Sequence, residues 1–293
     1  MNNSFIDIAR TGKNGFWLYV AGFVIVIVIA GISSFPTILV TDLKTQKPTV
    51  PAYQYLAVAI LQFIGIIIGL WLVMKFLHER PFKTLITPFA EINWKRIAQS
   101  AGLWFGITIV VEILFYSLYP NMYSFSLKTD DFIPALVVGL IMIPIQSTAE
   151  ELLFRGYLLQ GIGMKNIWVG VIITGVFFGL AHGLNPETEK VGFALGMSYY
   201  ISVGLFFALL AVFDKKLELP IGIHAANNVY AFLIVSYPDS VLPSPSIVSL
   251  TELNFPLMIF GWVITVVIYV FLANKIFDLQ PSIENQDNIV EIR

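Results

Sequence analysis

Cysteine is absent from this 293-residue sequence, and charged residues make up only 12% of it. The missing cysteines exclude disulfides, thiolate zinc sites and a cysteine nucleophile, which leaves Ser, Thr, His and carboxylates as the reactive side chains. The formal net charge of −2 is too small to indicate a nucleic-acid partner. With 57% hydrophobic residues, the composition instead predicts a polytopic membrane protein.

Long apolar segments occur about eight times, and a bilayer core about 30 Å thick needs roughly 20 such residues per helix. They cover residues 16–37, 53–74, 97–118, 132–159, 167–182, 191–213, 219–236 and 255–273. The first follows Arg10 and Lys13 as a signal peptide would, but it is long and lacks a small-x-small cleavage site, so we expect it to be retained. The sequence therefore predicts an all-α bundle of about eight transmembrane helices.

Basic residues are distributed unevenly between the two sides of the membrane that these segments define. With the N-terminus in the cytoplasm, 13 of the 17 Lys and Arg residues fall on or near the cytoplasmic side, and the others are Lys44, Lys47, Lys128 and Lys190. The positive-inside rule then favours both termini in the cytoplasm, and we expect an integral protein of the cell (plasma) membrane in contact with its lipid. The polar end, residues 280–293, is expected to be a mobile tail.

Three ionisable side chains lie close together in "EELLFR", although each charge at membrane depth costs roughly 2.5–3.5 kcal/mol. Glu151 and Arg155 are four residues apart, which puts them on one helical face where they can pair. Glu150 is rotated about 100° away from that face. One carboxylate is therefore neutralised locally, and the other is free for chemistry.

Two later segments repeat the four-residue spacing with other polar side chains. In "FFGLAH" an aromatic ring, Phe178, lies one turn from an imidazole, His182. In "HAANN" His224 and Asn228 share a face. Three segments thus each present a polar face within an apolar region, which a purely structural interpretation explains poorly.

Structural interpretations exist for the individual residues. Ser147-x-x-Glu150 fits a capping box, and Pro144 would help to break the preceding helix, so that Glu150 would only cap a new helix start. Glu112 is most simply a hydrogen-bonded packing residue, with a proton relay as the alternative. His78, at the end of an apolar segment, is expected to be structural or solvated.

The chemistry of the site is narrowed by motifs that are missing. The sequence has no G-x-S-x-G elbow, no H-E-x-x-H zinc pair and no Gly-x-Gly-Asp aspartate pair. What remains is a Glu acting as general base on a water, a His that shares the proton or orients the water, and a second His with an Asn that stabilises an oxyanion. This set predicts peptide hydrolysis or acyl transfer.

The ordered set "EELLFR", "FGLAH" and "HAANN" resembles the three motifs of the CAAX-protease and bacteriocin-processing (CPBP or Abi) family of intramembrane proteases. The resemblance implies a mostly α, eight-helix CAAX-protease-like fold that cuts a peptide bond inside the membrane. It also divides the chain into N-terminal helices in 1–131, a catalytic core in 132–232, and a last helix with a cytoplasmic tail in 233–293.

Carried over onto this sequence, the resemblance assigns a role to each motif. It implies that Glu150 and His182 activate the water, while His224 and Asn228 form the oxyanion site. The ion pair in "EELLFR" would hold the helix in place. A zinc ion bound by Glu150, His182 and His224 is the alternative, but a catalytic zinc that used Glu150 as a ligand would remove the base. We therefore expect no metal or other cofactor.

Other functions remain open at this stage. A processor of peptide leaders or bacteriocins differs from the main interpretation only in its peptide or protein substrate, which would enter from the membrane or the cytoplasmic side. A non-catalytic scaffold or bacteriocin self-immunity protein could retain the polar cluster for packing. A transporter would use intramembrane Glu and His as a proton relay, but no inverted pair of broken helices is evident.

Straight helices do not place the four expected catalytic residues at one depth. At 1.5 Å per residue, Glu150, His224 and Asn228 lie roughly 8–14 Å from the cytoplasmic ends of their helices, whereas His182 lies about 22 Å from its own. A helix break near residues 144–147, a strong tilt or a sunken turn would reconcile these depths.

Overall fold

Helices make up nearly all of the regular structure in the computed structural model, which describes residues 3–45, 47–237, 240 and 244–279. Six helical segments within these residues are long and apolar enough to cross a membrane. They are Phe16–Ile38, Ala52–Leu77, Trp94–Leu118, Thr129–Gly163, Phe193–Asp214 and Phe255–Phe277. The predicted class, a polytopic all-α membrane protein, is confirmed. The predicted number of eight spans is not confirmed, because six segments of the described residues reach the length of a span.

The other two predicted segments form shorter helices. They are α8, Ile167–Ala181 with 15 residues, and α11, Glu218–Leu233 with 16 residues. At 1.5 Å per residue each is about 22–24 Å long, less than the roughly 30 Å of a bilayer core. The segment predicted over 219–236 ends early because Val235–Ser236 forms a strand. These two short helices carry the histidines of the predicted site.

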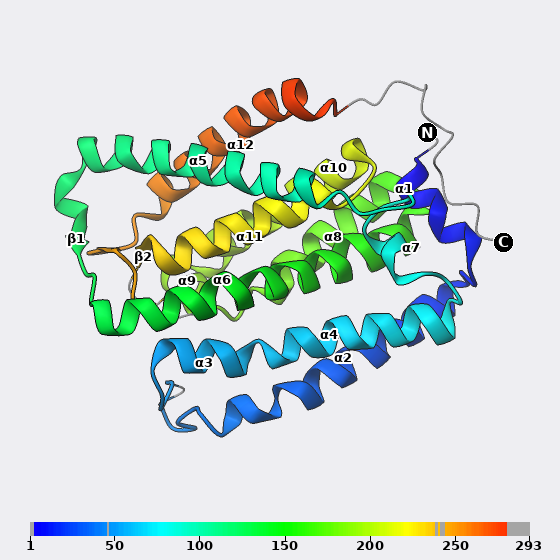
Figure 1. The fold of residues 1–293 in the computed structure, drawn as a ribbon, viewed down its shortest axis with the longest axis horizontal. Helices are drawn as coiled ribbons and strands as arrows, with labels where there is room; N and C mark the ends of the chain where they lie inside the picture. The colour runs from blue at the N-terminus through cyan, green and yellow to red at the C-terminus, as the bar shows by residue number, and fades with distance from the viewer. Residues whose placement is uncertain (1–2, 46, 238–239, 241–243, 280–293) are drawn as a thin grey trace.

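The helices are arranged in three groups (Figure 1). Helix α2 (Phe16–Ile38) lies beside α4 (Leu61–Leu72), which continues the shorter α3 (Ala52–Ala59). On the opposite side, α5 (Trp94–Leu118) lies beside α12 (Phe255–Phe277). Between them lie α6 (Thr129–Glu151), α8, α10 (Phe193–Asp214) and α11. The central group carries all three motifs.

Helix α6 is continuous through its second proline, which corrects the capping-box interpretation. Pro144 and Ser147 both lie inside the helix, and the Ser147 hydroxyl donates to the Ile143 carbonyl at 2.9 Å. No new helix begins there. A proline within a membrane helix leaves a backbone group without its hydrogen bond, but neighbouring helices can satisfy that group, so the helix can continue. The change in helix geometry comes later, where a π-helix, η5 (Leu152–Leu159), follows Glu151 directly and leads into α7 (Gln160–Gly163). Such π segments are frequent at functional sites.

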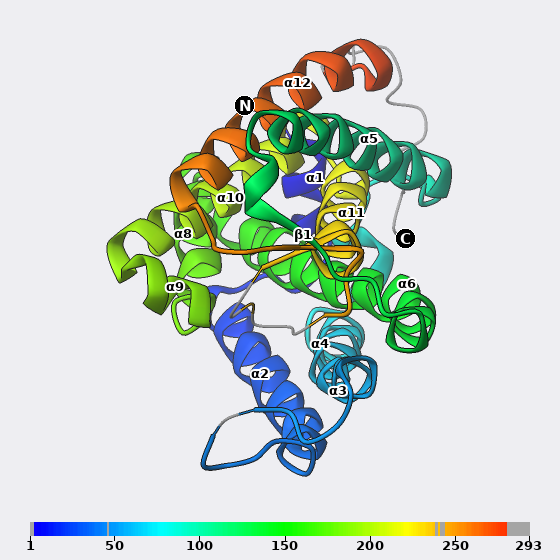
Figure 2. The same cartoon turned by 90° about the vertical axis from the view of Figure 1, so that its left-hand side faces the viewer.

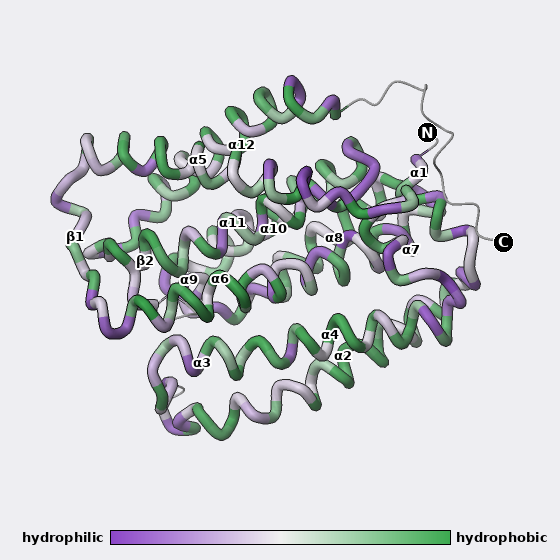
Figure 3. The backbone as a smooth tube through the Cα atoms, viewed as in Figure 1, coloured by the Kyte–Doolittle hydropathy of each residue, from purple (hydrophilic) through white to green (hydrophobic). Residues whose placement is uncertain are grey.

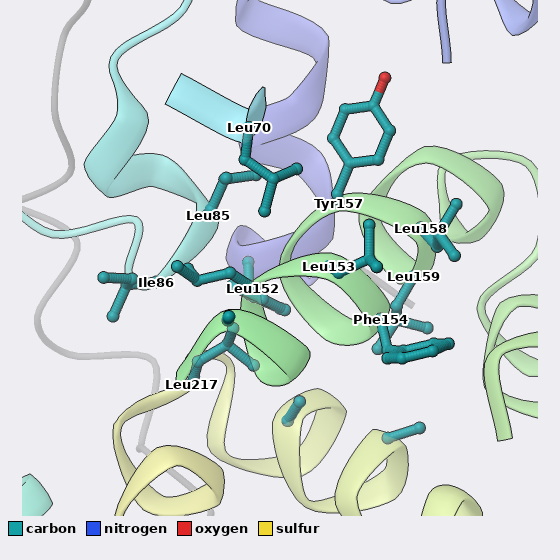
Figure 4. Packing of buried hydrophobic residues seen from close by; sticks show 14 of the residues in the cluster. Leu70, Leu85, Ile86, Leu152, Leu153, Phe154, Tyr157, Leu158, Leu159 and Leu217 are labelled. Carbon is teal, nitrogen blue, oxygen red and sulfur yellow. The ribbon is translucent and has the colours of Figure 1, made fainter. Parts of the chain in front are cut away.

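The π-helix is held by close packing on all sides. All eight of its residues are buried, and Leu152, Tyr157 and Leu159 are at most 1% exposed. Figure 4 shows these side chains packed with leucines from other elements, Leu85 among them. The backbone of Gly156 comes so near that an added Cβ would lie 2.8 Å from the Leu85 carbonyl oxygen. Tight packing of this kind fixes the orientation of the two glutamates just before the π-helix.

A small sheet closes one end of the bundle, where no strand was predicted from the sequence. Strand β1 (Tyr123–Phe125) pairs antiparallel with β3 (Val248–Leu250), and β3 pairs in parallel with β2 (Val235–Ser236). Figure 2 looks onto this end and shows the strands lying across it. The sheet joins the connection between α5 and α6 to the connection between α11 and α12.

The opposite end of the bundle is polar and carries the N-terminus. Helix α1 (Ser4–Asp7) buries Phe5 and Ile6 there, and the side-chain amide of Asn3 donates to the Val212 carbonyl at 2.8 Å. Figure 3 shows hydrophilic residues gathered near this end, whereas α2, α4 and α12 are mostly hydrophobic. The expected polar tail, residues 280–293, lies outside the described residues.

Candidate active site

The two adjacent glutamates occupy the last positions of α6, and the second is in a closed ion pair. Arg155 Nη1 donates to Glu151 Oε1 at 2.9 Å, and both side chains are fully buried. Arg155 Nη2 also donates to the Gly204 carbonyl at 3.1 Å, which ties η5 to α10. The guanidinium carbon lies 4.4 Å from the centroid of the Phe178 ring. The structure thus brings Glu151 and Arg155 together as their spacing suggested.

His224 of α11 lies between the two carboxylates. Its Nδ1 is 2.8 Å from Glu151 Oε1, and its Nε2 is 3.5 Å from Glu150 Oε2. Because a carboxylate accepts, the Nδ1 atom is assigned the proton in this contact. The Nε2 atom then faces Glu150 and the cavity described below.

Glu150 differs from its neighbour because no arginine or lysine among the described residues pairs with it. Its Oε1 accepts from Gln146 Nε2 at 2.6 Å, while its Oε2 is buried without a hydrogen-bond partner in the described part of the chain. Gln146 also accepts from Asn228 Nδ2 at 3.0 Å. This glutamine therefore connects Glu150, the candidate base, to the side-chain amide of Asn228. Gln146 was not predicted as a site residue, although its spacing of four residues from Glu150 was the available signal.

His182 caps the C-terminus of α8 and is held between two aromatic rings. Its Nδ1 lies 2.8 Å from the Phe178 carbonyl oxygen, so this nitrogen donates and Nε2 is left to face the cavity. The imidazole is 4.5 Å from the Phe178 ring and 4.6 Å from the Tyr200 ring, centroid to centroid. Within the described residues no hydrogen bond or ion pair joins His182 to Glu150. The centroid of the Phe178 ring is also 6.1 Å from that of His224, so both histidines lie near the same phenylalanine.

A cavity of about 1120 Å³ connects these side chains. Its wall includes Gln146, Glu150, His182, His224 and Asn228, together with residues of α2, α4, α5, α10 and α12. All four expected catalytic residues therefore line one space, even though α6 has no break at Pro144 to adjust their depths.

The geometry does not fit the alternative zinc set. Among the described residues no three His, Cys, Asp or Glu side chains come together as metal ligands. Glu150 and His224 are neighbours, but no hydrogen bond or ion pair joins His182 to either of them in the described residues. A catalytic zinc needs three protein ligands that converge, and these donors do not.

The two other ionisable residues noted in the sequence have hydrogen-bond partners. Glu112 accepts from the hydroxyls of Tyr123 and Tyr230, each at 2.5 Å. His78 is buried, and its ring nitrogens contact the Lys13 carbonyl and the Tyr157 hydroxyl. Burial lowers the pKa of His78, so its neutral form is favoured. These contacts agree with the packing interpretation of both residues.

Comparison with known proteins matches this chain to a family model and to a bacterial protein. A family model described as type II CAAX prenyl endopeptidase Rce1-like matches residues 130–230, which contain the four expected catalytic residues. "Uncharacterized protein YyaK" of Bacillus subtilis (strain 168) is 33% identical over 269 residues, and the match covers 86% of this chain and 89% of that protein.

Proposed function

This chain belongs to the Rce1-like type II CAAX prenyl endopeptidase family, and on that basis we propose that it hydrolyses peptide bonds within the membrane. The observation that carries the proposal is the environment of Glu150. Its Oε2 is buried, has no hydrogen-bond partner among the described residues, and lies at a cavity wall 3.5 Å from His224 Nε2. An unpaired carboxylate in such a position is suited to accept a proton from water.

In the proposed reaction, Glu150 removes a proton from a water molecule in the cavity. The water oxygen attacks the carbonyl carbon of the substrate, and the carbonyl oxygen becomes an oxyanion. The C–N bond then breaks, and the proton held by Glu150 passes to the leaving amine. Gln146 supports this role because its amide donates to Glu150 Oε1 and leaves Oε2 for the water.

We assign the oxyanion site to His224 and Asn228. With Nδ1–H donating to Glu151, a protonated His224 would direct its Nε2–H into the cavity. Asn228 is held by Gln146, which orients its amide beside His224. His182 would orient the attacking water through Nε2, which its bond to Phe178 leaves free.

The proposed mechanism uses no metal, because the three zinc-ligand candidates do not converge. The substrate would be a peptide or protein. Apolar residues of α2, α4 and α12 in the cavity wall favour its entry from the membrane over entry from the cytoplasmic side. The concentration of basic residues in the connections between helices favours a cell-membrane location with both termini in the cytoplasm.

Glu150→Gln tests the proposal. Purified protein in detergent is mixed with a library of apolar peptides, and the products are identified by mass spectrometry. We expect the variant to lose at least about 100-fold in cleavage rate, because removing a general base typically costs that much. We expect a chelator in the assay to leave the rate of the parent protein unchanged.

Glu112→Gln is the matched control, since Glu112 lines the same cavity but has tyrosine donors on both oxygens. We expect it to retain cleavage. Cleavage by Glu150→Gln at the parent rate would remove the catalytic assignment and favour a non-catalytic scaffold or self-immunity protein of the same fold. Inhibition by the chelator that added zinc reverses would contradict the metal-free mechanism.

A further inference from the structure

A second unpaired carboxylate lies in the cavity, outside the three motifs. Glu187 is in α9 (Pro186–Val191), the short helix that follows His182, and is only 5% exposed. Its Oε1 accepts from the Tyr200 hydroxyl and from Asn185 Nδ2 at 3.2 Å. Its Oε2 is buried and has no hydrogen-bond partner in the described part of the chain. One oxygen thus fixes the carboxylate, and the other has no donor within hydrogen-bond distance in the described residues, although the Tyr237 hydroxyl also interacts with this carboxylate.

This carboxylate is close to the proposed catalytic centre. The Tyr200 ring whose hydroxyl binds Glu187 stacks on the His182 imidazole, with 4.6 Å between centroids and 21° between planes. The Thr188 hydroxyl donates to the His182 carbonyl at 3.2 Å, and the Asn185 backbone N–H donates to the same carbonyl at 3.1 Å. The Tyr200 ring therefore lies between Glu187 and an imidazole that lines the cavity.

Carboxylates outnumber Lys and Arg side chains among the described residues that line the cavity. Three carboxylates line it, those of Glu112, Glu150 and Glu187, and no Lys or Arg does so among the described residues. Tyrosine hydroxyls occupy both oxygens of Glu112, and Glu150 lies beside His224. Glu187 is the carboxylate in this wall with neither a cationic neighbour nor donors on both oxygens, again within the described chain. A concave wall lined by negatively charged carboxylates attracts cations.

We propose that Glu187 forms a subsite that binds a positively charged side chain, Lys or Arg, of the substrate close to the cleaved bond. This inference rests on the proposed endopeptidase function. A carboxylate that is buried without a cation carries an uncompensated desolvation cost. A substrate that brings its own cation removes this cost on binding, whereas an acidic side chain at the same place would be repelled. The subsite would therefore select basic residues.

The first experiment compares cleavage of matched peptides. A cleaved apolar peptide is remade with Lys, Arg, norleucine or Glu at each position that flanks the cut, and kcat/KM is measured. For the parent protein we expect Lys or Arg to exceed norleucine by about tenfold or more at one position, as for charged interfacial contacts. Glu187→Gln should reduce this ratio to about one, because the amide keeps the bond to Tyr200 but loses the charge. Glu187→Lys should reverse the preference in favour of Glu.

Glu112→Gln is the control for the general charge of the cavity, and we expect it to keep the ratio. A preference for basic residues that survives in Glu187→Gln would overturn the subsite. The subsite is also overturned if Glu187→Gln lowers the rate on Lys and norleucine peptides by the same factor. That result would make Glu187 a positioning residue for His182 through Tyr200.

A binding experiment separates the subsite from the reaction. Fluorescent, N-acetylated hexapeptides of Leu and Ala with one Lys or one norleucine are titrated into Glu150→Gln protein in detergent. We expect the Lys peptide to bind about tenfold more tightly or better, and this preference to vanish when Glu187→Gln is added. A Lys preference that depends on Glu187, without cleavage by the parent, would refute the endopeptidase and retain the subsite. Cleavage that depends on Glu150, with equal binding of both peptides, would do the opposite.

Discussion

Buried carboxylates at the N-terminal end of the bundle differ from those in the cavity in how their charge is compensated. At the N-terminal end, Asp214 and Glu218 have side chains only 1% exposed, and Arg96 pairs with both. Lys216 also lies 3.6 Å from Glu218. In the cavity, Glu150 and Glu187 are almost as deeply buried, yet no Lys or Arg of the described chain pairs with either.

This difference separates structural charge from charge that is held for chemistry. The pairs made by Arg96 join α5 to the end of α10 and the start of α11, so each of these carboxylates has a cationic partner within the fold. The cavity carboxylates have no Lys or Arg partner in the described residues, whereas second oxygens without a hydrogen-bond donor occur in both groups, Asp214 Oδ2 and Glu218 Oε2 included. The two kinds of carboxylate are adjacent in the sequence, because Glu151, which forms an ion pair with Arg155, directly follows Glu150. A closed pair thus anchors the backbone that presents an open carboxylate.

Removing Arg155 should have the largest effect on stability. Arg155→Met would leave Glu151 as a fully buried charge whose main partner is gone, and breaking a buried pair from one side costs about 3–5 kcal/mol. We expect a large fall in the free energy of unfolding, measured by thermal or denaturant unfolding in one detergent. The double variant Glu151→Gln with Arg155→Met should recover much of the loss, because no unpaired charge remains. A double variant no more stable than the single one would show that the ion pair is not the cause.

Removing Arg96 should have a smaller effect. Its side chain is 13% exposed, so water can reach part of the site, and Lys216 still compensates Glu218. We expect Arg96→Gln to lower the free energy of unfolding by about 2 kcal/mol in the same assay. Lys13→Gln is the control, since Lys13 and Glu79 pair with both side chains 58% exposed, and exposed pairs contribute about 0–1 kcal/mol. Equal losses in the two variants would contradict the distinction between buried and exposed pairs.

Hydropathy predicted where the helices lie but not how each one ends. Length and apolar content are summed over many residues, so all eight segments were found as helices. Their ends depend on short local features. Helix α10 begins at Phe193 instead of residue 191 because Gly192, with a φ of 93°, interrupts the helical conformation after α9. The strand Val235–Ser236 shortens the segment with His224, and a strand of two residues has no periodicity to detect.

The site was predictable only where its contacts are local. Glu151 and Arg155 are four residues apart on one helix, and that spacing alone sets their distance. The contact of His224 with both glutamates depends on how α11 packs against α6, which no spacing encodes. Glu187 was missed for the same reason, since its partner Tyr200 lies 13 residues away on another helix. The capping-box interpretation was wrong because tertiary packing kept α6 helical through its proline.

Neutralising one of the cavity carboxylates Glu150 and Glu187 should have the smallest effect on the free energy of unfolding, and this effect should have the opposite sign. Glu150→Gln and Glu187→Gln each remove a buried charge that no Lys or Arg of the described residues compensates, and each retains one oxygen as an acceptor. We expect each variant to gain about 1 kcal/mol in the free energy of unfolding, since functional sites often hold such charges at the expense of stability. Unfolding in the detergent used for Arg155→Met measures the change, with Glu112→Gln as a control that should show no gain because tyrosines already donate to both oxygens. If Glu150→Gln instead lost as much stability as Arg155→Met, the cavity carboxylates would be structural groups like those at the N-terminal end.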